Sequence, residues 1–167
     1  ITMVSGDIME GKTGSGKVVE GTIKASAAFD YDFRIIDSAP GTGYPVLTCI
    51  KNSDYVVLVT EATSLAFKDL TKLVEIVEKK KRAYGIVINR ENIDPYIAEQ
   101  TKSYRRERYL GSLPSDETIA LALKKSVPPT RDSKSVKKLE EINERILTKI
   151  QNDVVPQSVS QQAQVLR

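Results

Sequence analysis

One acidic residue, Asp37, stands where a predicted strand meets a loop, and this position suits it for chemistry. The largely apolar run 33–36 is typical of a strand, and the segment Ser38–Gly43 that follows, with its Pro-Gly-Thr-Gly end, is typical of a tight loop. In open α/β sheets, ligands bind where parallel strands end. A carboxylate at such an edge commonly holds a magnesium ion on a nucleotide phosphate. The alternative is a polar strand end followed by a turn, with no ligand.

A second candidate is a glycine-rich loop that precedes a predicted helix. Its sequence, Gly11-Lys12-Thr13-Gly14-Ser15-Gly16-Lys17-Val18, has the glycines and the lysine of a phosphate loop. Val18 stands where Ser or Thr would bind magnesium, and the polar segment 5–10 separates the loop from the strand candidate before it. We therefore interpret it as a glycine loop that leads into a helix, whose amides and Lys17 could still contact an anion. A genuine phosphate loop is the alternative.

The composition excludes several kinds of site. The 167 residues contain no histidine and one cysteine, Cys49. This excludes Ser-His-Asp and Cys-His catalysis, an internal disulfide, and a cysteine-held zinc or iron–sulfur site within this chain. A net charge of +3 is too small to indicate nucleic acid, and no apolar run approaches the ~20 residues of a membrane helix. With no visible signal peptide, we expect a cytoplasmic protein with no membrane or nucleic-acid partner.

The elements that must position these residues alternate between strands and helices. Apolar positions recur at helical spacing in some segments, whereas 55–60 and 85–89 are continuous apolar runs. Such runs predict strands buried on both faces, hence a parallel sheet. In chain order we expect strands at 1–4, 33–37, 55–60, 85–89 and 109–113, and helices at 16–29, 45–51, 64–82, 95–104, 117–125 and 133–150. The predicted fold class is α/β, a mainly parallel sheet with helices on both faces.

The length suits one domain with a proper core. We place that domain at residues 1–150. The segment 151–167 has no clear periodicity, so we expect a disordered tail there. The chain starts with Ile1 in a strand-like segment rather than with methionine, and we therefore expect it to begin inside a larger protein.

Polar or turn-forming residues follow the later predicted strands as well. Thr60, Asn89-Arg90 and Pro114-Ser115 each stand at or just after the end of an apolar run. Because the carboxyl ends of parallel strands meet at one edge of a sheet, we expect these residues to gather there with Asp37. The alternative is that each residue simply ends its strand.

Taken together, these motifs resemble the C-terminal two-thirds of a MinD/Mrp-type ATPase, within the wider ParA and cobyrinic acid a,c-diamide synthase group of P-loop NTPases. The matching stretches are 35–46, 54–63, 85–90 and 110–114, and the resemblance covers roughly 1–150. Gly14–Val19 is similar to a loop that follows an inserted ferredoxin domain in one branch of the family. The resemblance therefore favours that branch.

The resemblance implies an ATP-binding and ATP-hydrolysing protein. Asp37 would be the catalytic carboxylate, acting near the attacking water and holding magnesium through water. The implied nucleotide-binding residues are Pro40, Gly41, Thr42, Gly43, Asn89, Arg90, Leu113 and Pro114. The loop 40–43 would be the switch that senses the γ-phosphate, Asn89 would hydrogen-bond the adenine edge, and the Leu113–Pro114 loop would close over the base. Ala39 replaces the proline usual in that branch, which should alter loop stiffness rather than chemistry.

The family's own phosphate loop lies earlier in its sequence and is not in this chain. We therefore expect an incomplete P-loop NTPase fold that is inactive alone. By the resemblance, the intact protein would bind ATP and magnesium and form a homodimer around the nucleotide. It would couple ATP hydrolysis to iron–sulfur cluster handling with client or redox proteins, and its own cluster would lie in the ferredoxin part that this chain lacks. The alternative is a non-catalytic scaffold or partner-binding domain that keeps the fold without nucleotide.

Overall fold

The computed structural model describes residues 1–7, 14–130 and 133–154. The chain divides into two compact units, Ile1–Asp54 and Tyr55–Arg167, and each is described by itself. The assignment of 1–150 to one domain stays a prediction. Most of the predicted tail, from residue 155 onward, and residues 11–13 of the glycine-rich loop lie outside the described residues. No helix in the described ranges is long and apolar enough to cross a membrane.

The second unit is built on a parallel sheet with the strand order β1-β2-β3. Strand β1 (Tyr55–Glu61) pairs along its whole length with β2 (Ala83–Asn89), and Glu61 lies opposite Asn89 at the end. Strand β3 (Tyr109–Ser112) pairs with the other side of β2 after a register shift. Because the three strands are parallel, their carboxyl ends lie at the same edge.

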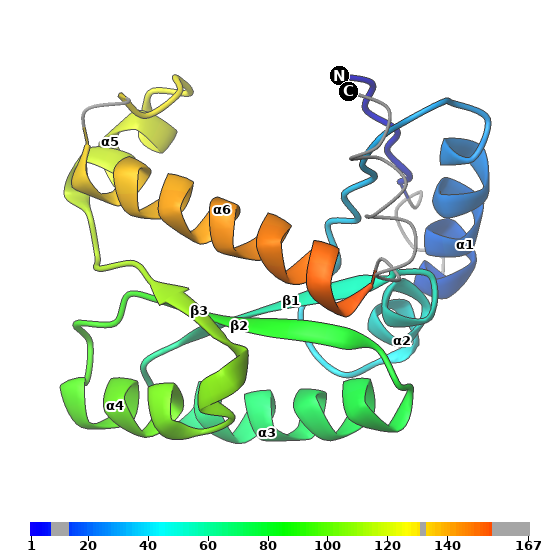
Figure 1. Cartoon of the computed structure of the whole chain (residues 1–167). Coiled ribbons are helices and arrows are strands. Elements are labelled where there is room, and N and C mark those ends of the chain that lie inside the picture. The colour runs from blue at the N-terminus through cyan, green and yellow to red at the C-terminus, as the bar shows by residue number, and fades with distance from the viewer. Residues whose placement is uncertain (8–13, 131–132, 155–167) are drawn as a thin grey trace, which may run out of the picture. The chain divides into compact units, whose positions relative to one another are not determined.

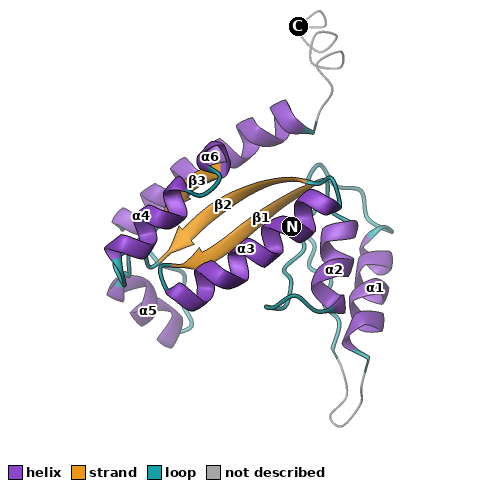
Figure 2. Cartoon of the chain, turned by 90° about the horizontal axis from the view of Figure 1, so that it is seen from below, coloured by secondary structure: helices purple, strands orange, loops and turns teal. Residues whose placement is uncertain are grey.

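Helices cover the two faces of this sheet. Helix α3 (Ser64–Lys79) packs on β1 and β2 and contacts α4 (Pro95–Ser103), whereas α6 (Lys134–Asp153) packs on β3 and β2. Figure 1 shows the sheet between these layers, and Figure 2 shows β1 and β2 from below. Two shorter helices, η1 (Arg106–Arg108) and α5 (Glu117–Lys124), flank β3 in sequence. The predicted α/β class, a parallel sheet flanked by helices, is confirmed.

Side chains that directly precede α3 and α4 cap the N-termini of these helices. Thr63 Oγ1 accepts a hydrogen bond from the Ala66 N–H at 3.2 Å, and Asp94 Oδ1 accepts from the Tyr96 N–H at 3.0 Å. Such caps satisfy backbone donors that have no partner inside the helix. Apolar spacing then buries one face of each helix, as at Val74 of α3, which is fully buried.

Two sequence-based expectations for the second unit were wrong. Strand β1 is not buried on both faces, since Val57 and Val59 are 38% and 66% exposed. The reason is that α6 packs on β3 and β2, while β1 is covered by α3 on its other face. The last helix also runs to Asp153, so the first residues of the predicted tail, 151–153, are helical.

The first unit contains two helices that contact each other, α1 (Ser15–Ser26) and α2 (Tyr44–Lys51). The Tyr44 hydroxyl donates a hydrogen bond to Glu20 Oε1 at 2.5 Å. Gly16 permits the close approach, because a Cβ at that position would lie 2.2 Å from a ring carbon of Tyr44. The predicted short helix at 45–51 is confirmed as α2, and its side chains Val46 and Ile50 are buried.

Neither strand predicted for the first unit forms. Residues 1–4 and 33–37 are irregular, and Phe33 and Ile35 are 64% and 93% exposed. A strand requires a neighbour that takes up its backbone N–H and C=O groups. The sheet of the described residues contains β1, β2 and β3 and no partner for residues 33–37. Asp37 is consequently not at a strand end.

Candidate functional site

The residues predicted to form the site are divided between the two units. Asp37 and Pro40–Gly43 lie in the first unit, whereas Asn89, Arg90, Leu113 and Pro114 lie in the second. The members of each set lie close together within their own unit. That the two sets form one site stays a prediction.

Asp37 lies in an exposed segment that leads into α2. Gly41 has a φ of +102°, a conformation that glycine adopts without a steric penalty. Gly43 is the N-cap of α2, and its carbonyl accepts from the Leu47 N–H at 3.1 Å. The loop 40–43 therefore stands at a helix N-terminus, where free N–H groups favour an anion such as a phosphate.

No group of three or more His, Cys, Asp or Glu side chains in the described ranges could hold a metal ion by itself. Magnesium bound with a nucleotide does not need such a group, because it keeps several waters and takes phosphate oxygens as ligands. One accessible carboxylate is enough, and the exposed Asp37 provides it. The donor set thus fits the water-mediated role expected for Asp37.

Asn89 and Arg90 stand at the carboxyl end of β2. The Asn89 side chain is half-buried, and no residue of the described ranges hydrogen-bonds to its amide group. Arg90 has a φ of +53°, a left-handed conformation that costs about 1–3 kcal/mol for a residue other than glycine. Its Nη1 lies 3.4 Å from Glu61 Oε1, but both side chains are largely exposed, so this pair contributes little. Other contacts must hold the strained turn.

Leu113 and Pro114 lie beside that turn. The Leu113 N–H donates to the Ile88 carbonyl at 2.8 Å, and the Leu113 carbonyl accepts from the Glu91 N–H at 3.0 Å. These two bonds extend the pairing of β2 and β3 beyond Ser112. One step further, the Ser115 N–H donates to Asn92 Oδ1 at 2.7 Å. The structure thus brings the four predicted residues of the second unit to neighbouring strand ends.

Glu91 is a residue of this edge that the sequence analysis did not single out. Its carboxylate accepts a short hydrogen bond from the Ser112 hydroxyl and lies 3.1 Å from Lys102 Nζ and 3.3 Å from Lys138 Nζ. Burial raises the pKa of Glu91, but the hydrogen bonds from Ser112, Lys102 and Lys138 outweigh it and lower the pKa to about 2. Its only sequence signal is an acidic residue two positions after a strand end.

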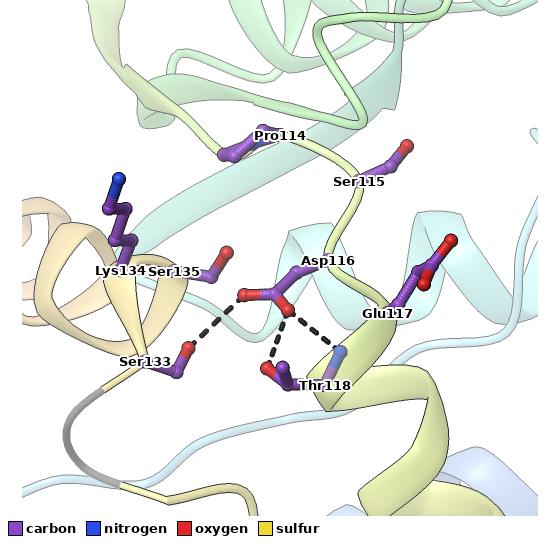
Figure 3. A pocket seen from close by; sticks show the side chains of 8 residues that line it. All are labelled: Pro114, Ser115, Asp116, Glu117, Thr118, Ser133, Lys134 and Ser135. Atoms are coloured by element: carbon purple, nitrogen blue, oxygen red, sulfur yellow. Dashed lines mark hydrogen bonds between the residues drawn. The ribbon is translucent and has the colours of Figure 1, made fainter.

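A pocket of about 350 Å³ opens next to Pro114, between the loop after β3 and the start of α6 (Figure 3). Asp116 lies in it, accepting from the Thr118 N–H at 2.9 Å and from the Ser133 hydroxyl at 3.2 Å. The hydrogen bonds from Thr118, and the nearby hydroxyls of Ser135 and Ser133, hold the pKa of Asp116 well below its usual range. Asp116 is also the N-cap of α5. The pocket therefore contains an ionised carboxylate, with the hydroxyl groups of Thr118, Ser133 and Ser135 close to it.

Ser135, whose hydroxyl oxygen is buried, lies in the wall of this pocket. Ser135 is only 2% exposed, and its Oγ has no hydrogen-bond partner of acceptable geometry in the described ranges. Its side chain points toward Asp116 (Figure 3). The polar group that the pocket offers to a ligand is therefore the Asp116 carboxylate.

No protein-family model matches the sequence. Among curated proteins, the chain is 34% identical over 83 residues to the uncharacterized protein MJ0579 of Methanocaldococcus jannaschii, covering 50% of this chain and 31% of the relative. It is 28% identical over 131 residues to the uncharacterized ATP-binding protein MJ0685 of the same organism, covering 73% of this chain and 51% of the relative. The chain thus spans between about a third and about half of the length of these relatives.

Two solved structures share the fold. A putative plasmid partition protein of Borrelia burgdorferi bound to AMPPNP aligns with a TM-score of 0.65 at 21% identity, over 77% of this chain and 56% of that chain. The cell division ATPase MinD of Pyrococcus furiosus aligns with a TM-score of 0.61 at 23% identity, over 80% of this chain and 57% of that chain. The expected fold of MinD- and ParA-type P-loop ATPases is confirmed. The branch with an inserted ferredoxin domain stays a prediction.

Proposed function

We propose that this chain carries the adenine-binding and switch parts of an ATP-binding and ATP-hydrolysing protein of the MinD/Mrp type. The observation that supports this most strongly is the arrangement at the carboxyl ends of the adjacent strands β2 and β3, where Asn89 ends β2 and Leu113–Pro114 follow β3. Ligands of open α/β sheets bind at this edge. A neighbour with the same fold was solved with AMPPNP, which supports an adenine nucleotide as the ligand.

Each group at this edge suits one part of the nucleotide. The Asn89 amide offers a donor and an acceptor, which is what the edge of adenine requires. Arg90 lies next to it and is exposed, and Pro114 offers an apolar face for the base. The carboxylate of Asp116, in the pocket beside Pro114, can accept hydrogen bonds from ribose hydroxyls.

The first unit carries the residues for which the resemblance implies a role at the phosphates. Magnesium, when bound with ATP, bridges phosphate oxygens and neutralises their charge. Asp37 holds the ion through water and orients the attacking water, and the loop Pro40–Gly43 responds to the γ-phosphate through its exposed backbone amides. We keep the interpretation that Gly14–Lys17, at the start of α1, is not the phosphate loop.

For the whole protein, we propose a nucleotide-dependent homodimer that couples ATP hydrolysis to iron–sulfur cluster handling with client or redox proteins. The basis is the resemblance of Gly14–Val19 and of the switch segment to the branch with an inserted ferredoxin domain. Mass measurement by light scattering with and without ATP tests the dimer. Visible absorbance of the anaerobically purified whole protein tests the cluster, and a colourless, iron-free protein would contradict that part.

Isothermal calorimetry of the full chain with magnesium and ATP tests the prediction that this chain alone binds ATP weakly or not at all. Without a phosphate loop to hold the triphosphate, we expect no micromolar binding. Micromolar binding would contradict this prediction. In that event Lys17→Ala decides whether Gly11–Lys17 is a genuine phosphate loop, because this substitution would then abolish the binding.

A catalytic role of Asp37 is tested in the whole protein, if that protein hydrolyses ATP. Asp37→Ala should lower kcat about 10²–10⁴-fold, the usual contribution of a residue that positions the attacking group. Asp32→Ala, a change to an exposed carboxylate five positions earlier, serves as the control and should leave turnover unchanged. Unchanged turnover in Asp37→Ala would refute the assignment.

A further inference from the structure

The two loops at the proposed adenine site have no regular structure of their own. Residues 90–94 follow β2, and residues 113–116 follow β3. Three backbone donors fix them to each other and to β2: the N–H groups of Leu113, Glu91 and Ser115. The loops must therefore keep one relative position for these bonds to persist, and a side-chain contact between them would enforce that position.

The Glu91 carboxylate fixes its loop to Ser112, the residue directly before the second loop, and it joins several elements at once. The Ser112 hydroxyl binds it from the end of β3. Lys102 reaches it from α4, on the side of the sheet covered by α3 and α4, and Lys138 reaches it from α6, on the other side. One carboxylate thus links the end of a strand with the helices on both faces.

The geometry also explains how the strained residue before Glu91 is held. Arg90 has a left-handed backbone, and its own ion pair with Glu61 is exposed. The next residue, Glu91, is held at two points: its backbone N–H donates to the Leu113 carbonyl, and its carboxylate accepts from the Ser112 hydroxyl. Asn89 precedes Arg90 directly, so the position of its amide depends on this turn.

We propose that Glu91 is a positioning residue for the adenine site, whose carboxylate holds the 90–94 and 113–116 loops in the arrangement that a bound adenine nucleotide requires. This inference rests on the proposed function. Glu91 does not touch the ligand. It acts by ordering the loops before binding, so that the nucleotide does not have to supply the free energy of ordering them.

A matched control for Glu91 lies at the opposite end of the strands. Glu78, near the end of α3, accepts from the Tyr84 hydroxyl at 2.7 Å and from Arg105 Nε at 3.0 Å. Like Glu91, Glu78 joins separate elements, here through one hydroxyl and one cation, those of Tyr84 and Arg105. Unlike Glu91, it does so near the start of β2, where Tyr84 stands. Replacing it removes a similar set of bonds at a site without predicted ligand groups.

The test compares the full chain with Glu91→Gln, Ser112→Ala and Glu78→Gln. Amide chemical shifts are followed during titration with AMP, which has the adenosine moiety and needs no γ-phosphate contact. Hydrogen exchange of the Glu91 and Ser115 amides reports loop order. We expect both edge variants to exchange faster at these amides and to bind AMP more weakly, about tenfold for Glu91→Gln. Glu78→Gln should bind AMP as the wild type does, whatever its change in Tm.

The outcomes separate this inference from the function on which it rests. Wild-type protein that shows no shifts at Asn89 or Leu113 with AMP would refute the adenine site and the role of Glu91 together. Wild-type binding that is equally strong in Glu91→Gln and Ser112→Ala would refute Glu91 as a positioning residue and leave the adenine site standing. Equal weakening by Glu78→Gln would also refute it, because stability alone would then account for the loss. If Glu91→Gln does not fold, AMP binding by Ser112→Ala, which changes no charge, decides whether the Glu91 contact is needed for the adenine site.

Discussion

The two units contain the same kind of sequence segment with different structural outcomes. In each, an apolar run of strand character leads into a polar loop that carries predicted ligand groups, at 33–43 and at 85–94. The second run is the central strand β2, buried and paired on both sides. The first is irregular and exposed. An apolar run therefore predicts a tendency to form a strand, and its neighbours decide whether the strand forms.

The largest expected effect comes from truncating one isoleucine in each run. Ile86 of β2 is fully buried, so Ile86→Ala should lower the free energy of unfolding by about 2–5 kcal/mol. Ile35 is 93% exposed, and Ile35→Ala should change the free energy of unfolding by less than about 0.5 kcal/mol. Urea denaturation measures both. A cost for Ile35→Ala close to that for Ile86→Ala would show that the segment 33–37 is packed in solution.

The pH dependence of stability tests the ordered strand ends of the second unit. The folded pKa of Glu91 is about 2, below the ordinary value of 4.5. A lowered pKa means that the stabilisation is fully present above pH 4.5 and is lost as the pH falls toward 2. The difference in unfolding free energy between wild type and Glu91→Gln, on the order of 2 kcal/mol at pH 7, should therefore shrink below pH 4.5. A difference that stays constant from pH 7 to pH 3 would contradict the charged contacts.

Replacing one glycine in each unit by alanine should have opposite effects on stability. Gly111 of β3 has a φ of +155°, and a Cβ there would lie 2.6 Å from Ile142 Cγ1, so Gly111→Ala should cost about 1–3 kcal/mol. Gly21 of α1 has nothing within 4 Å of such a Cβ. Gly21→Ala should stabilise the chain by up to about 1 kcal/mol, through the higher helix propensity of alanine. Thermal unfolding measures both variants, and the opposite signs are the diagnostic result.

Most of the second unit could be predicted from the sequence, because its signals are local. Periodicity located α3 and α6, and the continuous apolar run located β2. The caps Asp94 and Asp116 are local signals as well, because each acts within three residues of its helix start. The strands expected at 1–4 and 33–37 did not form. No local pattern states whether a neighbouring strand is present.

The contacts of the candidate site were predictable only in part. Asn89 and Leu113–Pro114 were expected at the strand ends, and they lie there. The role of Glu91 depends on Ser112 and Lys138, which are 21 and 47 residues away in the sequence, and on Lys102 of α4. Such a cluster exists only after the sheet and both helix layers have assembled, so no motif marks it.

Photolabelling of the full chain with 8-azido-AMP, followed by mass spectrometry of the labelled peptides, tests whether adenine binds at the ends of β2 and β3. An adenine site at the ends of β2 and β3 predicts labelling confined to peptides that contain residues 89–92 or 113–118, and loss of the label when unmodified AMP competes. The scaffold alternative predicts no labelling that AMP can displace. Displaceable labelling at Gly14–Val18, or elsewhere in the first unit only, would contradict the assignment of the adenine site to the ends of β2 and β3.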